Sequence, residues 1–441
     1  MRFYKGIVGL AVAVATTVAP YLMCQAANAP EGLADGPGIW MNMWNYPSVD
    51  YDTYTQGLHA KGIRNLFIQT SRSNTPAIAN PDKLGPLIDA CHKYKIRVIA
   101  WSFAELQNPV ADADKMIEAA RFSSPTGQHI DAIAPDIEKD VRPIKVEPYS
   151  KHLRQVLGPN YPMIAVVYSP LNLAPQVAQI PWKLLDRYYD VIAPMNYWNS
   201  KYKKLDAYDY TKSTIAKVRQ LVGRPDVEIH IIGDAMGTNS ATIMPFFKAC
   251  SEGQVTSASL YPNFKMTNEQ MECIGHYSEY FPINSRFRLA AMRELIKNGT
   301  MESPTNLDPA AAMSRGDFYK LVVRHMYAGK PQAAEAGLTP ETAANFLEHN
   351  GVLKAANAPA DALNAPFSQG EALRVVASLV DFKSSGKHPK PAAPKKSGHW
   401  FSQPAFAEGA SSSAVISQAN FKPMNYLDAG QIVLQASSGL R

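Results

Sequence analysis

The feature that most constrains the fold of this chain is an alternation of short apolar runs with longer amphipathic stretches, repeated eight times between Gly38 and about His276. The runs are rich in β-branched and aromatic residues, which favours buried strands, and the stretches carry apolar residues every three or four positions, which indicates helices. The predicted strands cover residues 39–44, 63–69, 96–103, 130–138, 163–168, 190–197, 227–233 and 256–261. The predicted helices cover residues 83–94, 112–121, 148–157, 182–189, 211–222 and 241–251.

Eight strand–helix units within about 240 residues match an α/β fold of the (β/α)8 or TIM barrel type. The strands of such a barrel are buried on both faces, so they are expected as nearly continuous apolar runs. A doubly wound open sheet is the main alternative, but no glycine-rich phosphate loop follows the first run. The sequence therefore predicts a barrel over residues 30–280.

The first 29 residues have the pattern of a secretory signal peptide. Arg2 and Lys5 precede an apolar run, and the small residues 27–29 form a cleavage pattern. An uncleaved membrane anchor is the alternative, although Pro20 interrupts a run already short for a span of roughly 20 residues. No later segment is long and apolar enough to cross a bilayer. We therefore expect a secreted or cell-envelope protein, in the periplasm or at the cell surface, with no transmembrane segment after cleavage.

Residues beyond the barrel are expected to form a closing helix and linker (281–305), a small all-α module (306–382) and a flexible basic tail (383–441). An apolar patch at 426–434 in this tail has no predicted partner.

Two segments of the module, 314–318 and 368–372, open helices in the same way, with Ser-Arg-Gly-Asp-Phe and Ser-Gln-Gly-Glu-Ala. These segments resemble S-layer homology modules, whose repeats open with Thr-Arg-Ala-Glu before a helix. The resemblance implies non-covalent attachment to a cell-wall polymer, with Arg315 kept in the first copy and Gln369 in its place in the second. The alternative is a plain helical accessory domain, in which Asp317 and Glu371 simply favour the first turn of a helix.

The charge of the chain argues against a nucleic-acid partner. The formal net charge is +6, from 44 Lys and Arg against 38 Asp and Glu. Arg2 and Lys5 lie in the leader, and five lysines lie between positions 383 and 396 of the tail. The remainder is within one charge of neutrality, which leaves no basic patch for a nucleic-acid backbone.

Histidine and cysteine spacing predicts neither a metal site nor a cofactor. The ten histidines show no His-x-x-x-His or His-x-His pattern, and no Walker loop or nucleophile elbow occurs. Cys91, Cys250 and Cys273 remain after cleavage of the leader. A disulfide between Cys250 and Cys273, which flank one predicted strand, and three buried free thiols are equally open alternatives.

The segment with the clearest chemistry is the fourth predicted strand, which contains Asp136 and Glu138. Alternate side chains of a strand share a face, so both carboxyls are expected inside the barrel, with Glu138 nearer the C-terminal mouth where barrel enzymes place their sites. Repulsion between them raises the pKa of one, which lets a Glu donate a proton to a leaving oxygen. The alternative is a pair that forms a salt bridge or caps the next helix.

This strand and the sixth resemble those of family-eighteen chitinase-like glycosidases, which carry Asp-x-x-Asp-x-Asp-x-Glu on strand four and Met-x-Tyr-Asp on strand six. Asp131, Asp136 and Glu138 match three of the four acids, and Met195 and Tyr197 match the sixth strand. The resemblance implies Glu138 as general acid, Asp136 as the residue that orients an acetamido group, and Tyr197 as its hydrogen-bond donor. The sugar's own N-acetyl oxygen would then be the nucleophile.

The chain departs from that family pattern at several positions. Ala134 replaces one acid, Trp198 stands in place of another, Tyr261 ends strand eight where the family has Trp, and the Ser-x-Gly-Gly of strand three is missing. The resemblance is therefore that of a distant relative over about residues 36–276.

Aromatic residues near the predicted strand ends favour a saccharide, because flat rings stack on pyranose faces. The candidate substrate-binding residues are Trp44, Trp101, Tyr168, Trp198, Asp234, Tyr261 and Arg72. Asp234 and Glu105 are also alternative second carboxylates for a conventional acid/base pair, or helix caps. A loop salt bridge is the alternative role of Arg72.

Three functions remain open from the sequence. The first is an exported glycoside hydrolase acting on a cell-envelope or extracellular polysaccharide, with an N-acetylated one as the case that the family resemblance implies, and without a cofactor. The second is a non-catalytic carbohydrate-binding barrel, and the third is a structural envelope protein.

Overall fold

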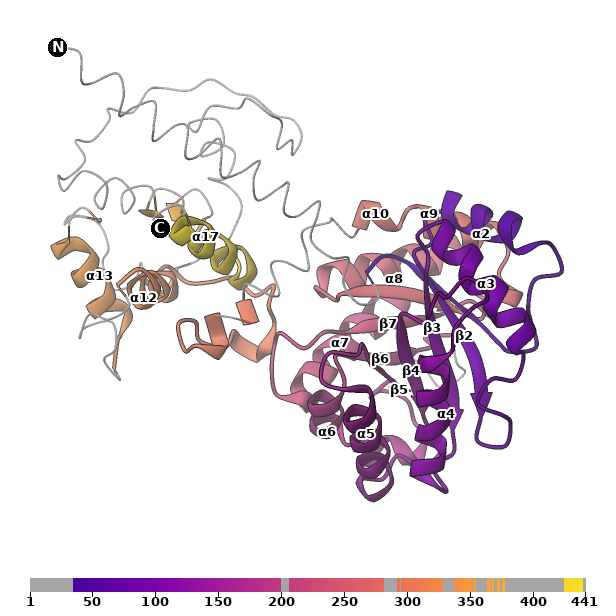
Figure 1. The fold of residues 1–441 in the computed structure, drawn as a ribbon. Coiled ribbons are helices and arrows are strands. Elements are labelled where there is room, and N and C mark those ends of the chain that lie inside the picture. The colour runs from indigo at the N-terminus through magenta and orange to yellow at the C-terminus, as the bar shows by residue number, and fades with distance from the viewer. Residues whose placement is uncertain are drawn as a thin grey trace, which may run out of the picture. The chain divides into compact units, whose positions relative to one another are not determined.

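The chain divides into two compact units in its computed structural model (Figure 1). The barrel unit comprises Pro30–Arg286 with Asn306–Asp308, and the helical unit contains Phe287–Thr305 and Pro309–Arg441. The structure describes residues 35–199, 206–280, 292–293, 295–327, 337–350, 352–353, 363–365, 367–368, 371–372, 375–376 and 424–438. The predicted signal peptide and residues 383–423 of the predicted tail lie outside these residues.

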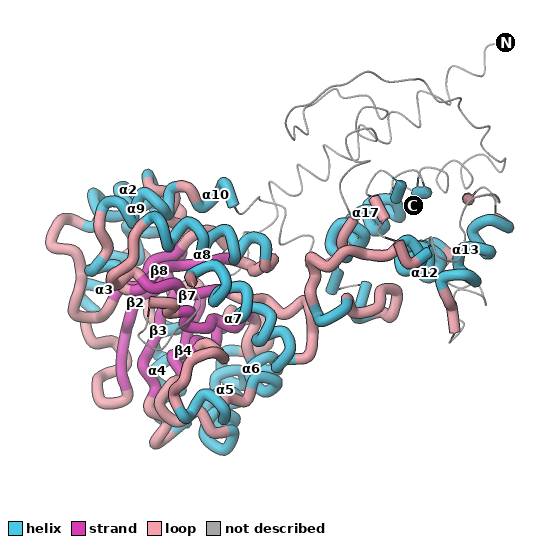
Figure 2. The backbone as a smooth tube through the Cα atoms, turned by 180° about the vertical axis from the view of Figure 1, so that it is seen from behind, coloured by secondary structure: helices cyan, strands magenta, loops and turns pink. Residues whose placement is uncertain are grey.

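The barrel unit is a closed ring of eight parallel strands in the order β1 to β8, with β1 paired to β8. This ring confirms the predicted (β/α)8 barrel, and Figure 2 shows the strands surrounded by helices. The strands are β1 (Gly38–Met41), β2 (Asn65–Arg72), β3 (Arg97–Ala104), β4 (Ala132–Ile137), β5 (Ile164–Tyr168), β6 (Val191–Asn196), β7 (His230–Asp234) and β8 (Ser257–Tyr261).

The helices that follow the strands include all six predicted ones, which agree to within a few residues apart from α5. They are α2 (Tyr51–Ala60), α3 (Pro81–Lys93), α4 (Pro109–Arg121), α5 (Pro143–Leu157), α6 (Trp182–Tyr188), α7 (Ala207–Val222), α8 (Ser240–Glu252), α9 (Asn268–Gly275) and α10 (Tyr277–Tyr280), with 3-10 turns η1 (Pro175–Gln179) and η2 (Asn263–Lys265). Helix α5 begins at Pro143 and keeps Pro148 inside it, whereas the sequence predicted a start at Pro148.

Helix α2 was not predicted, because its burial pattern is weak. Only Thr55 and Leu58 of this helix are buried, so little apolar periodicity marks it in the sequence. The helix is instead fixed by its cap, since the Thr53 amide donates to the Asp50 carboxylate at 2.9 Å. Helix α9 was also missed, and it begins with a capping box formed by Thr267 and Gln270.

The strands separate two apolar layers, as expected for strands buried on both faces. The outer layer packs against the helices and includes Ile68, Ile133 and Leu260. The inner layer fills the ring and consists of Trp40, Phe67, Ile99, Trp101, Ala132, Ala134, Ile164, Val166, Val191, Ala193, Met195 and Ile232. Because side chains alternate between the layers, each strand position has a defined direction.

The three cysteines left after the predicted leader are buried free thiols. Cys250 and Cys273 therefore do not form the disulfide that was one of the two alternatives. No helix of the described part of the chain is long and apolar enough to span a membrane.

The helical unit contains η3 (Thr305–Leu307 in part), α12 (Arg315–Met326), α13 (Pro340–His349) and α17 (Tyr426–Ser438). The segment expected to close the barrel instead contributes Met292 and Leu295 to the core of this unit. The apolar patch at 426–434 lies in helix α17, and its partner is the core of the helical unit, in which Leu427 and Val433 are buried.

Three segments of the helical unit open in the same way, with a buried apolar residue, a capping side chain and an acid three positions after the cap. The backbone amide of each acid donates to the cap at 2.9–3.2 Å. The three sets are Met313, Ser314 and Asp317; Phe367, Ser368 and Glu371; and Met424, Asn425 and Asp428. Backbone hydrogen bonds join the sets, from Met313 to Met424 and from Met424 to Phe367. The repeated unit therefore has a third copy, which the sequence analysis placed in a flexible tail.

Candidate active site

The inner face of strand β4 places two carboxyls at the C-terminal mouth of the barrel. Asp136 and Glu138 are two positions apart, in phase with Ala132 and Ala134 of the inner layer. Asp136 is 7% exposed, and its Oδ1 has no hydrogen-bond partner among the described residues. Glu138 lies one residue beyond the strand and is partly exposed. The two acids thus differ in depth, with Glu138 toward solvent.

Both carboxyls hold protons more tightly than usual. Burial and the neighbouring charge of Glu138 raise the pKa of Asp136 well above its ordinary value. Burial also raises the pKa of Glu138, against a hydrogen bond from Tyr168 and the charge of Arg72, which lower it. The sequence analysis expected repulsion to raise the pKa of one carboxyl, whereas burial raises the pKa of both. The two groups titrate as a pair.

Three phenols surround the acid pair from strands β5, β6 and β8. Tyr197 stacks on Tyr261 with ring centroids 6.1 Å apart, and Trp101 meets Tyr261 edge-on at 6.4 Å. Burial raises the pKa of Tyr168, Tyr197 and Tyr261, and the charges of both acids raise it further. All three phenols therefore stay protonated and can donate hydrogen bonds near the carboxyls.

Trp101 and Trp44 occupy different environments at this end of the barrel. Trp101 is 6% exposed, and its indole Nε1 donates to the Met41 carbonyl at 3.1 Å, so it forms part of the inner layer beneath the mouth. Trp44 follows strand β1 and is 64% exposed. Of the two, only Trp44 presents a ring face to solvent.

Trp198 does not line the mouth, and its predicted role in substrate binding is wrong. Its side chain is 5% exposed and stacks on Phe246 of α8 at 4.9 Å, in the outer layer. The cause is strand parity: Met195 and Tyr197 point inward, so residue 198 points to the helices.

Two further acids of the sequence analysis have structural partners. Asp131 matches the family motif but lies at the opposite end of β4, where it accepts from the Val98 amide at 2.7 Å and contacts His92 at 2.9 Å. Asp234 ends β7, and its Oδ1 accepts from the Met236 amide at 2.8 Å. Its charge also raises the pKa of Tyr197, so it lies near the phenols.

Sequence reasoning missed two amide side chains at the mouth. Asn42 forms a hydrogen bond with Tyr261, and its own Oδ1 is buried without a partner in the described chain. Gln176 interacts with Tyr168, and its Nε2 donates to the Glu138 carbonyl at 3.4 Å. Both lie in loops after strands, and no motif marks them, so only the closed ring brings them to the site.

The mouth is also bordered by apolar side chains. Most large apolar side chains that the described residues leave exposed come from the segments that follow the C-terminal ends of strands. These are Trp44, Val49, Val110, Ile144, Leu173, Met236 and Phe264. The segments after the eight strands meet at one end of a barrel, so these residues are on the side of the acid pair.

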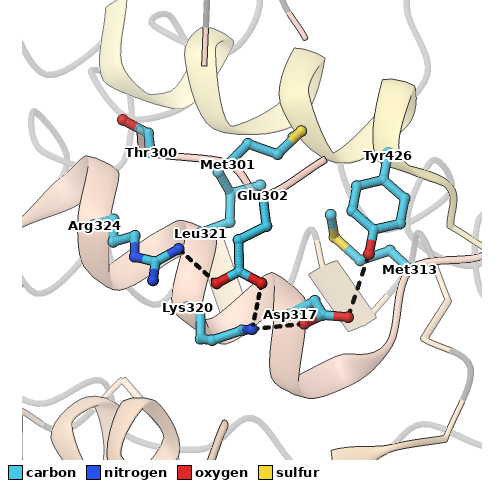
Figure 3. Close-up of a pocket in the computed structure, with 9 residues that line it drawn as sticks. All are labelled: Thr300, Met301, Glu302, Met313, Asp317, Lys320, Leu321, Arg324 and Tyr426. Carbon is cyan, nitrogen blue, oxygen red and sulfur yellow. Dashed lines mark hydrogen bonds and ion pairs between the residues drawn. The ribbon is translucent and has the colours of Figure 1, made fainter. Parts of the chain in front are cut away.

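A small hollow in the helical unit is filled by its own charges (Figure 3). Glu302 accepts from Lys320 at 3.0 Å and from Arg324 at 2.9 Å, and Lys320 also contacts Asp317 at 2.9 Å. The hollow has room for about one water molecule. Its charged groups neutralise one another, so we assign it no binding role. Nowhere among the described residues do three or more ligand-type side chains gather as at a metal site.

No protein-family model matches the sequence, and none of the curated proteins matches it. The structure is similar to solved barrel structures at low identity. A chitinase from Rhizomucor miehei is 10% identical with a TM-score of 0.43, covering 55% of this chain and 99% of that one. A family GH18 chitinase from Cycas revoluta, in complex with allosamidin, is 8% identical with a TM-score of 0.42, covering 54% and 98%. A thiamine phosphate pyrophosphorylase from Pyrococcus furiosus is 12% identical with a TM-score of 0.33, covering 56% and 94%.

Proposed function

We propose that the barrel unit is a glycoside hydrolase that acts on an extracellular or cell-envelope polysaccharide, with Glu138 as the general acid. The observation that carries this proposal is the proton-retaining pair at the mouth, formed by a partly exposed Glu138 above a buried Asp136. Cleavage of a glycosidic bond requires an acid that protonates the departing oxygen. A carboxyl whose pKa is raised by burial is such an acid.

The second role needed for hydrolysis is a nucleophile or a base, and an N-acetylated sugar supplies one itself through its acetamido oxygen. Under this proposal the unpartnered Oδ1 of Asp136 accepts the acetamido N–H, and the Tyr197 hydroxyl donates to the acetamido oxygen. Asp234 is the alternative second carboxylate for a substrate without this group.

The test is hydrolysis by Glu138→Gln, measured as release of reducing ends from a panel of N-acetylated and non-acetylated polysaccharides over a range of pH. Loss of the general acid should lower turnover by about 10²- to 10⁴-fold. Glu147→Gln is the matched control, because Glu147 is an exposed acid of helix α5 that has no assigned part in the site. Unchanged hydrolysis by Glu138→Gln on the glycan that the wild type cleaves would refute the assignment.

A non-catalytic carbohydrate-binding barrel is the second candidate, and Ala134 is the observation in its favour. Ala134 is fully buried on the inner face of β4, two residues before Asp136. It places a methyl group where the family that this strand resembles has an acid. Binding of oligosaccharides without product at any pH would favour this candidate. Export and attachment through the helical unit stay predictions.

A further inference from the structure

The loop after strand β2 is held rigidly at the mouth by a single lysine. The Lys115 ammonium of α4 donates to the carbonyls of Arg72, Ser73 and Thr75 at 2.9, 2.5 and 2.6 Å. The Arg72 amide in turn donates to Thr75 Oγ1 at 2.8 Å, and the Glu105 amide donates to Ser73 Oγ at 2.8 Å. The backbone that carries Arg72 is therefore fixed by its own loop and by the segment from the end of β3 to helix α4.

The Arg72 side chain is positioned by rings and not by acids. Its guanidinium carbon lies 4.7 Å from the centre of the Phe103 ring and 5.9 Å from that of Trp44. Among the residues that the structure describes, no carboxylate forms an ion pair with it and no side chain accepts its N–H groups, so the loop salt bridge that the sequence allowed is not formed. Stacking covers the faces of the guanidinium and leaves its in-plane donors available.

This guanidinium belongs to the same site as the acid pair. Its charge lowers the pKa of Asp136, Glu138 and Tyr261 against the effect of their burial, so it lies within electrostatic range of all three. An arginine serving only to neutralise these acids would be expected to pair with one of them. Among the described residues its five donors have no acceptor, and the two rings hold their fork within electrostatic range of the pair.

We propose that Arg72 binds a carboxylate of the substrate, so that the saccharide recognised by this barrel is an acidic one. The fork of a guanidinium matches a carboxylate with two parallel hydrogen bonds, and aromatic stacking fixes its orientation before the ligand arrives. The exposed ring of Trp44 beside Arg72 offers a face for the pyranose that carries the acid. This inference rests on the proposed function only in taking a saccharide as the ligand.

The carboxylate has two chemical sources in glycans, a uronic acid and a lactyl ether on an amino sugar. Both are tested by binding, measured by titration calorimetry on the full chain carrying Glu138→Gln, so that no substrate is consumed. The probes are a uronic-acid oligosaccharide, a lactyl-ether amino-sugar oligosaccharide, and the methyl ester of each. We expect at least one free acid to bind about 10- to 100-fold more tightly than its ester.

Adding Arg72→Gln should abolish that preference while leaving the affinity for the ester nearly unchanged. Arg72→Lys should restore only part of it, because an ammonium keeps the charge but lacks the fork. Arg142→Gln is the matched control: Arg142 lies at the same end of the barrel and is already paired with Asp140 at 2.8 and 2.6 Å. Its removal should leave the preference intact.

The result that overturns the inference is equal binding of acid and ester by the parent protein, or an equal loss for both on Arg72→Gln. Failure to bind any of the four probes overturns it too. These outcomes are separable from failure of the proposed function. Hydrolysis of a neutral glycan that is lost in Glu138→Gln would support the glycosidase and refute the acidic substrate, and acid-selective binding without hydrolysis would do the reverse.

Discussion

The two ends of the barrel interior each bury a titratable side chain, but they differ in how completely its hydrogen bonds are formed. At the N-terminal end, His230 contacts Ser257 Oγ at 2.6 Å and Ser259 Oγ at 2.7 Å through its two ring nitrogens. Ser259 also accepts from the Trp40 indole at 2.7 Å. At the mouth, one carboxylate oxygen of Asp136 has no partner in the described chain, and neither do Asn42 Oδ1 and Gln69 Oε1. The N-terminal network is complete, whereas the mouth retains acceptors.

This difference indicates which end is structural and which is functional. A buried polar group with all its partners adds to stability, while an orphaned one costs about 1–3 kcal/mol. Such atoms also occur elsewhere in the described chain, Thr256 Oγ1 directly before β8 among them, so the acceptors at the mouth matter for their place beside the acid pair and not for their number. A ligand that donates hydrogen bonds at the mouth would satisfy these acceptors. Without the ligand, the mouth is less stable than a site whose buried groups are all paired.

The largest effect should come from Asp136→Asn at the mouth. We expect hydrolysis to fall by about 10²- to 10⁴-fold, because an amide cannot share the proton of the pair. Stability should instead rise. The folded pKa of Asp136 is raised, so the carboxyl stabilises the fold only while protonated, and this contribution is lost as pH rises through the folded pKa.

Urea unfolding followed by tryptophan fluorescence should therefore show a larger gain for Asp136→Asn at pH 8 than at pH 4. Asp114→Asn is the control, since Asp114 is an exposed acid on α4 whose partner is His152 at 2.8 Å. A variant that is less stable than the wild type at neutral pH would contradict the view that the mouth is strained by its buried acid.

The next effect concerns the opposite end, where His230→Ala should destabilise without impairing the site. Removal of the imidazole takes away its hydrogen bonds to Ser257 and Ser259 and leaves a cavity, and we expect a cost of about 2–4 kcal/mol at pH 7. Turnover per folded molecule should stay within about twofold. A loss of turnover comparable to that of Asp136→Asn would remove the distinction between the two ends.

The same variant should change how stability depends on pH. Burial lowers the pKa of His230 from 6.5 to about 3, so below pH 6.5 the unfolded chain takes up a proton that the folded chain does not. Stability of the wild type therefore falls on acidification toward pH 3. Between pH 7 and pH 4 this linkage amounts to at most about 3 kcal/mol, so the wild type and His230→Ala should converge near pH 4. Parallel curves would show that burial does not lower the pKa of His230 in the fold.

The features of the fold and site that could be predicted from the sequence are those set by residues close together in the chain. The eight strands are visible because burial on both faces makes each a continuous apolar run, and strand parity alone correctly places Asp136 and Glu138 inside. Parity would also have placed Trp198 outside, had the inward phase of strand β6 been fixed from Met195 and Tyr197. Helix α2 was missed because Leu58 is its one buried aliphatic side chain, while Tyr51 and Tyr54 pack only partly buried against the core.

Other features depend on distant contacts that no local pattern encodes. The third capped segment of the helical unit begins at Met424. It resembles the first two in its backbone hydrogen bonds and its cap, not in sequence identity. Asn42 reaches Tyr261 only because β1 pairs with β8 at closure. The ring contacts of Arg72 likewise join three separate strand ends.

The smallest effect should come from Tyr168→Phe, which changes the pKa of Glu138 without removing either acid. The Tyr168 hydroxyl lowers the pKa of Glu138 by hydrogen bonding, in opposition to burial. Without it the proton is held more tightly, so the pH profile of hydrolysis should move to higher pH by less than about one unit, with the maximal rate changed only a few-fold. Tyr161→Phe is the control, because that hydroxyl donates to the Ile130 carbonyl at 3.3 Å, at the other end of the barrel. A shift to lower pH would mean that Tyr168 does not stabilise the ionised Glu138, and that the two acids are tuned by depth alone.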